Sequence, residues 1–196
     1  MELPGLPPLA WTHGEGDAAL GPDGELTLTA AAGVDWTNDP TGTEFEHQHG
    51  STSLSFLVTE DFQLSARVRV DAPRSTFDAG ALTIWSDADH WAKVCFERSP
   101  QGGDMIVSVV TNTYSDDSNA TDVDAGAAWL RVSRLDRAFV FHSSNDGVEW
   151  RLVRIFRLLT DRPVVCGFMA QAPMGESAIA RFDRIRYSSG PLAEYR

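Results

Sequence analysis

The chain has 196 residues, of which 42% are hydrophobic and 22% charged, and its net charge is −12. This length and composition suit one folded domain and exclude wholesale disorder. The acidic balance disfavours nucleic acid and anionic membranes as partners, because both are bound through clustered Lys and Arg. No run approaches the roughly 18 apolar residues of a membrane helix. Residues 1–9 lack the basic and apolar regions of a signal peptide, so we expect a cytoplasmic protein.

Short runs that alternate between apolar and polar residues predict strands along most of the chain. After an irregular lead-in over 1–24, which holds one early strand near 9–13, we expect strands at 25–30, 53–58, 62–70, 105–111, 129–134, 138–142, 148–156, 164–171 and 178–187. Residues 33–50 are dense in turn formers and predict a long loop carrying Trp36 and Phe45, and residues 115–124 predict an acidic loop.

No segment longer than about ten residues keeps a convincing helical period. The pattern predicts an all-β fold: a two-sheet antiparallel β-sandwich of the jelly-roll kind, forming a single domain over 1–196 with its core at about 25–188. The side chains expected in the core are Leu64, Ala66, Val68, Leu82, Ile84, Val94, Phe96, Leu130, Val132, Phe139 and Phe141.

Residues 78–97 predict a hairpin with a polar tip at 86–90. Because side chains alternate faces along a strand, the core receives Ala92, Val94 and Phe96, and the opposite face carries Trp91, Lys93, Cys95 and Glu97. The five-residue tip predicts a register that pairs Trp85 with Trp91, Thr83 with Lys93 and Ala79 with Glu97. A face that combines tryptophan, lysine and glutamate indicates a binding surface.

Five motifs follow one another in the chain: Phe77-Asp-Ala-Gly80, Trp91-x-Lys93-x-x-x-Glu97, Thr111-Asn-x-x-Ser115-Asp116, Trp129-Leu-Arg131-x-x-Arg134 and Ser143-x-x-Asp146-Gly147-x-x-Trp150. Together they resemble the domain family named for a yeast regulator of enolase expression, over roughly 25–188. The resemblance implies a concanavalin A-like lectin/glucanase sandwich whose concave sheet often receives glycans, and it implies no established activity. The chain has Asp117-Ser118 where the family pattern would place an aromatic residue.

We interpret the concave face as a non-catalytic site for a saccharide or a sugar-like small molecule. The residues expected to contact the ligand are Trp36, Asn38, Asp39, Asp78, Trp85, Trp91, Lys93, Glu97, Asn112, Ser115, Asp116, Arg131, His142 and Gln171. Two alternatives stay open. One is a regulatory protein-interaction module, with a homodimer among its partners, and the less favoured one is a glycan-active hydrolase, lyase or isomerase that uses Glu97.

Glycoside hydrolysis normally needs two carboxyl groups, and this strand face shows only one. A second would have to come from Asp39, Asp78 or Asp116. A cation beside Glu97 should lower the pKa of its carboxyl group, because a nearby positive charge favours the ionised form. Lys93 and Glu97 lie about 13 Å apart along the strand, so they interact only if a third group lies between them or if their long side chains converge. A structural ion-pair network in which Arg131 neutralises Glu97 is the competing interpretation.

No metal or cofactor is expected. The acidic residues of 116–124 offer oxygen ligands, but their spacing fits no EF-hand loop, and His47-x-His49 is at most a weak metal site. Cys95 and Cys166 lie inside apolar runs, which predicts buried free thiols.

Overall fold

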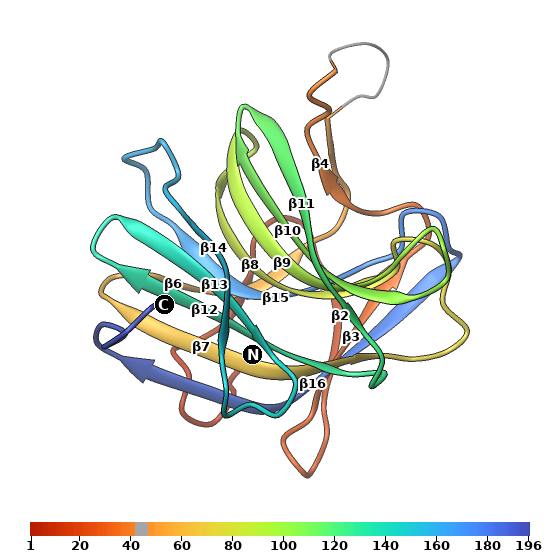
Figure 1. Cartoon of the computed structure of the whole chain (residues 1–196), viewed down its shortest axis with the longest axis horizontal. Coiled ribbons are helices and arrows are strands. Elements are labelled where there is room, and N and C mark those ends of the chain that lie inside the picture. The colour runs from red at the N-terminus through yellow and green to blue at the C-terminus, as the bar shows by residue number, and fades with distance from the viewer. Residues whose placement is uncertain (42–46) are drawn as a thin grey trace.

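The computed structural model describes residues 1–41 and 47–196 of the chain, so the predicted position of Phe45 lies outside the described part. Within that part, two seven-stranded antiparallel sheets pack face to face as the layers of a sandwich (Figure 1). The predicted fold class is therefore confirmed. None of the described residues forms a helix with the length and apolarity that crossing a bilayer requires.

Sheet A contains, in spatial order, β1 (Ala10–Trp11), β6 (Ser53–Leu57), β15 (Val165–Gln171), β8 (Ala79–Asp87), β9 (His90–Arg98), β10 (Asp104–Asn112) and β11 (Tyr114–Val123). Sheet B contains β14 (Arg151–Phe156), β13 (Ala138–Ser144), β12 (Ala128–Leu135), β7 (Phe62–Val70), β16 (Ser177–Ser189), β3 (Leu26–Ala31) and β2 (Asp17–Leu20). A separate ribbon pairs β4 (Trp36–Thr37) with β5 (Gln48–His49).

The core lies between the two sheets and holds every side chain that the alternation placed there. Phe139 is the most exposed of these predicted core residues at 5%, and the others are fully buried. Each buried leucine, valine or phenylalanine contributes about 1.5–3 kcal/mol by leaving water. The alternation of β7, β9 and β12 therefore fixes which of their faces meets the other sheet.

The predicted acidic loop at 115–124 is wrong, because residues 115–123 belong to β11. Ser, Asp and Asn have low strand propensity, so the local sequence disfavours a strand here. The strand exists because β10 supplies a nine-residue antiparallel partner at the edge of sheet A. Exposed acidic side chains on such an edge also discourage pairing with another chain.

Two other departures are smaller. The expected loop at 33–50 contains the short β4–β5 ribbon, and β2 occupies part of the expected irregular lead-in. The strand expected from Val148 begins only at Arg151, because a hydrogen-bonded turn occupies the preceding residues.

Candidate functional site

The β8–β9 hairpin has the predicted register. Trp85 is opposite Trp91, Thr83 is opposite Lys93, and Ala79 is opposite Glu97. The face of sheet A that points away from the core is nevertheless not open to solvent over its whole length. A second apolar cluster covers much of it, formed by Trp36, Ala79, Ala81, Trp91, Cys95, Met105, Val107, Val109 and Met169.

Trp36 covers the tryptophans of the hairpin. Its ring centre lies 4.6 Å from that of Trp85 and 5.7 Å from that of Trp91, and its indole Nε1 donates a hydrogen bond to Ser51 O at 2.6 Å. Trp36 and Trp91 are 1% and 0% exposed. The predicted role of Trp91 as a contact surface for a ligand is therefore wrong, because it is fully buried against Trp36. Trp36 itself is almost covered, and Trp85 is only partly exposed beside them.

Trp36 belongs to residues 34–41 and 47–51, called the covering segment from here on. Asn38 and Ser115 attach this segment to sheet A. The amide of Asn38 donates to Ala88 O at 2.9 Å and to Thr113 O at 2.8 Å, and its Oδ1 lies 2.8 Å from His49 Nε2. The Ser115 hydroxyl accepts a hydrogen bond from the Asn38 backbone amide at 2.9 Å. Both side chains are buried and already bonded within the protein, so they hold the segment in place instead of facing a ligand.

Lys93, Gln171 and Glu97 form a buried hydrogen-bonded chain. Lys93, the only lysine in the sequence, donates from Nζ to Asp35 Oδ1 at 2.5 Å, to Trp36 O at 2.9 Å and to Gln171 Oε1 at 2.9 Å. Gln171 Nε2 in turn donates to Glu97 Oε2 at 3.3 Å. Gln171 is thus a third group that lies between Lys93 and Glu97.

The charges of this network differ from the expectation. Burial raises the pKa of Glu97 to about 7, with Asp35 and Asp117 adding to the rise and Lys93 opposing it. The predicted lowering is wrong because Asp35 already neutralises the lysine and because Glu97 is only 6% exposed. Burial lowers the pKa of Lys93, but the surrounding acidic groups, Asp35 foremost, together outweigh burial and raise this pKa above its ordinary value.

A pocket of about 290 Å³ opens above Lys93 and Glu97. The expectation of a single carboxyl group on this face is wrong, because Asp35 and Asp117 also line the pocket, in place of the suggested Asp39, Asp78 or Asp116. Burial raises the pKa of Asp117. The other lining residues are Trp36, Thr37, Phe77, Pro100, Gln101, Met105, Val107, Val109, Asn119 and Gln171.

Phe77 is the exposed aromatic residue of this pocket. It is 36% exposed and has a φ of 66°, a backbone conformation that is strained for a bulky side chain. Its amide donates to Arg98 O at 2.8 Å, and its carbonyl accepts from Gln171 Nε2 at 3.0 Å. The sequence placed Phe77 in a motif but gave it no role. Asp35, just before β4, and Asp117, in β11, were missed because their places in the pocket depend on contacts distant in the chain.

Four other residues that the sequence predicted as ligand contacts form their hydrogen bonds or ion pairs outside the pocket. Asp78 is buried and accepts from the Ser75 amide at 2.7 Å, and burial raises its pKa. Asp39 caps a turn by accepting from the Thr41 amide at 2.8 Å. Asp116 pairs with Arg154 at 2.7 Å, and Asn112 accepts from the Leu159 amide at 2.7 Å. None of these four lines the pocket.

Arg131 and His142 are not part of this site, which corrects the prediction. They are opposite each other on β12 and β13, in sheet B, whereas Glu97 is in sheet A. Arg131 therefore does not neutralise Glu97. Its guanidinium instead lies over the Trp150 ring, 4.3 Å from the ring centre.

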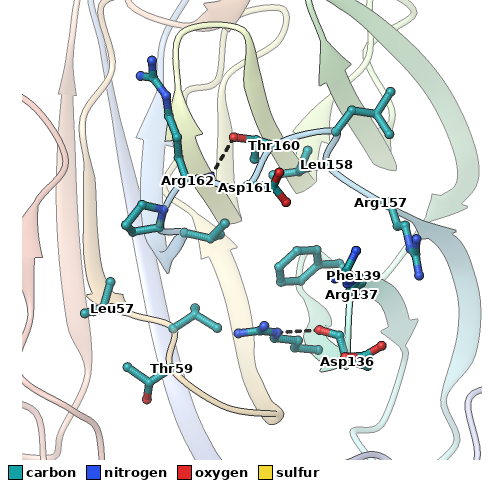
Figure 2. A pocket seen from close by; sticks show the side chains of 15 residues that line it. Leu57, Thr59, Asp136, Arg137, Phe139, Arg157, Leu158, Thr160, Asp161 and Arg162 are labelled. Atoms are coloured by element: carbon teal, nitrogen blue, oxygen red, sulfur yellow. Dashed lines mark hydrogen bonds between the residues drawn. The ribbon is translucent and has the colours of Figure 1, made fainter.

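Figure 2 shows a broader hollow of about 760 Å³ at one end of the sandwich. The residues that line it include the apolar Phe139 and Leu158 and several arginines, among them Arg157 and Arg162. Metal ligands are not gathered here or elsewhere: across 1–41 and 47–196, no three His, Cys, Asp or Glu side chains are grouped to hold an ion.

Residues 11–190 match the family described as "Protein of unknown function (DUF1349)". The chain belongs to this family. No curated protein gives a significant match to this DUF1349 protein. It is similar to a functionally unknown protein from Saccharomyces cerevisiae, with 24% identity and a TM-score of 0.82 over 95% of this chain and 98% of that one.

Two solved enzymes share the fold of the DUF1349 protein more distantly. A xylan beta-1,4-xylosidase from Bacillus halodurans C-125 is 16% identical with a TM-score of 0.64, and the match covers 85% of this chain but only 33% of the xylosidase. An alginate lyase from Klebsiella pneumoniae is 11% identical with a TM-score of 0.56, over 88% of this chain and 84% of the lyase. At these identities the likeness shows a common β-sandwich fold.

Proposed function

We propose that the DUF1349 protein binds a neutral saccharide or sugar-like polyol, without converting it, in the pocket above Lys93 and Glu97. The observation that carries this proposal is the exposed ring of Phe77 in one pocket with the carboxyl groups of Glu97 and Asp117. Ligand sites of this size combine apolar walls with a few convergent polar groups. The apolar face of a sugar ring would pack on Phe77 while its hydroxyls bond to the acids.

The charge of the pocket supports a neutral ligand. Asp35, Glu97 and Asp117 line it, and its one cation, Lys93, already donates three hydrogen bonds within the protein. A carboxylated or sulfated sugar would meet like charge, which costs binding energy. Neutral hydroxyl groups can donate to the carboxylates without that cost.

A neutral and acidic oligosaccharide array, followed by titration calorimetry of the hits, tests the proposal. We expect neutral glycans to bind and Phe77→Ala to weaken them about two- to tenfold, the loss of one aromatic contact. Tyr114→Ala is the matched control, since Tyr114 is an exposed aromatic residue that does not line the pocket. Failure of every neutral glycan to bind would refute the proposal.

A glycan-active enzyme is the second candidate, and the protonation of Glu97 favours it. A carboxyl group with a pKa of about 7 suits general acid–base catalysis near neutral pH, and Asp117 supplies a second carboxyl group in the same pocket. If this candidate holds, the protein releases reducing ends, and Glu97→Gln abolishes turnover while substrate affinity is kept. If the protein only binds, Glu97→Gln weakens affinity and no turnover is seen in either form.

The assignment to the yeast enolase-regulator type, the cytoplasmic location and the homodimer belong to the same proposal. The five motifs support the first of these. Cell fractionation and light scattering of the purified chain test the last two directly.

A further inference from the structure

The outer face of sheet B carries a second pocket, of about 520 Å³, around Arg131. Because Leu130 and Val132 enter the core, Arg131 points away from it. Its Nε is buried and has no hydrogen-bond partner, and no carboxylate of the described residues pairs with its guanidinium. A half-buried cation without a counter-ion among the described residues is therefore built into this face.

Such an arrangement costs free energy, because the charge loses its water and gains no ionic partner. Burial lowers the pKa of Arg131 to about 10, which still leaves the group charged at neutral pH. The ring of Trp150 recovers part of the cost as a cation–π contact. The buried Nε–H has no hydrogen-bond partner, and a guanidinium group offers further N–H donors that a carboxylate can bind with two parallel hydrogen bonds.

The lining of this pocket is opposite in charge to the rest of the molecule. It contains Arg131 and Arg186 and no Asp or Glu, in a chain whose net charge is −12. Aromatic side chains form its walls: Trp129, Trp150 and Tyr187. An anion would therefore find complementary charge here, whereas the pocket on sheet A would repel it.

The turn before Trp150 holds the walls in position. Asp146 Oδ1 accepts two backbone amide hydrogen bonds, at 2.8 and 2.9 Å, which fix the turn. Gly147 has a φ of 75°, and a Cβ at this position would lie 2.7 Å from the Trp129 ring, so the turn packs directly on that indole. The two motifs around Arg131 and Trp150, which the site on sheet A does not use, thus converge on one pocket.

We propose that this pocket binds an organic carboxylate whose ring can pack on an indole face, such as a sugar acid or an aromatic acid. The carboxylate would bind the guanidinium group of Arg131, and the ring would lie against the tryptophans. A planar two-oxygen group matches the guanidinium fork, and the aromatic walls favour a flat substituent over a compact inorganic anion. This site is separate from the saccharide pocket proposed above and does not depend on it.

The test follows the indole N–H signals of the six tryptophans in ¹⁵N-labelled protein during titration with D-galacturonate and with benzoate. D-galactose and benzyl alcohol are the matched uncharged probes, and inorganic phosphate represents a compact anion. Trp129→Phe and Trp150→Phe assign the two signals at the pocket. We expect at least one of the two acids to shift these signals, and the one that binds identifies sugar or aromatic acid as the preferred source.

Arg131→Gln should weaken carboxylate binding at least tenfold, the loss expected for a charged hydrogen-bonded contact. Arg157→Gln makes the same charge change at an exposed arginine outside this pocket and should leave binding unchanged. Arg131→Lys keeps the charge but not the fork, so it should also bind more weakly, and it replaces Arg131→Gln if that variant does not fold.

The inference is overturned if neither acid shifts the two indole signals, if the uncharged probes or phosphate shift them as strongly, or if the Arg131 variants bind like the wild type. Glu97→Gln should leave this binding intact. Failure of the wild type to bind any neutral glycan therefore refutes the sheet A proposal without affecting this one.

Discussion

The protonation of Glu97 is the property on which the chemistry of the sheet A pocket depends. The folded protein raises the pKa of this carboxyl group to about 7 from an ordinary value of 4.5. Because the folded pKa is the higher one, the folded state binds a proton that the unfolded state has lost between these pH values. The stability that this proton contributes is fully present below about pH 4.5 and is lost as pH rises through about 7.

Glu97→Gln removes the titration while keeping the shape of the side chain. The pKa rises by about 2.5, and each pKa unit corresponds to about 1.4 kcal/mol, so the wild type should lose about 3 kcal/mol between pH 4.5 and pH 8 that the variant keeps. Urea unfolding of both proteins across this range measures the difference, in which the other titrating groups largely cancel. The two proteins should be about equally stable at pH 4.5, and the variant should be the more stable at pH 8.

Glu149→Gln is the control, because it makes the same substitution at an exposed glutamate and measures how much a Glu-to-Gln change at the surface alters the free energy of unfolding. A difference between wild type and Glu97→Gln that stays flat with pH would refute the reasoning. A variant less stable than the wild type at pH 8 would also refute it, and would mean that Glu97 is ionised and needed by the buried lysine.

Three further predictions test the supports of the two pockets. Lys93→Met should destabilise the protein by about 3–5 kcal/mol in urea unfolding, since it leaves a carboxylate without its buried partner, and a loss below about 1 kcal/mol would contradict that role. Gly147→Ala should cost at least about 1 kcal/mol more than Gly126→Ala, because both have positive φ but only the first Cβ would strike an indole; equal losses would mean that this contact is unimportant. Cys95 and Cys166 should resist a thiol reagent in the native protein at pH 8 and react after unfolding, because burial raises the pKa of both thiols; labelling of the native protein would contradict this.

The covering segment, residues 34–41 and 47–51, decides what the sheet A pocket can bind. It brings Asp35 to Lys93 and Trp36 over the hairpin, and Asn38 ties it to the neighbouring turns. Without this segment the tryptophans of the hairpin would be exposed, as the sequence suggested. With it, the exposed aromatic surface of the pocket is the ring of Phe77.

The sequence by itself determined the sandwich, most strand positions, the core faces and the hairpin register. These follow from local alternation and turn chemistry: the pattern of Ala92, Val94 and Phe96 is enough to orient β9, and the short polar tip is enough to pair Lys93 with Thr83. Such features need no knowledge of distant residues.

Only the tertiary structure decided which side chains meet and how they are charged. The strand β11 forms because β10 is beside it, although Asp117 and its neighbours disfavour a strand, and that pairing brings Asp117 into the pocket. The alternation along its strand places Arg131 on the outward face whichever sheet the strand joins. The strand order then places it in sheet B. The pKa of Glu97 depends on its burial and on the ion pair between Asp35 and Lys93. In the chain, Lys93 lies 58 positions from Asp35 and 78 positions from Gln171, and no local pattern encodes contacts over such separations.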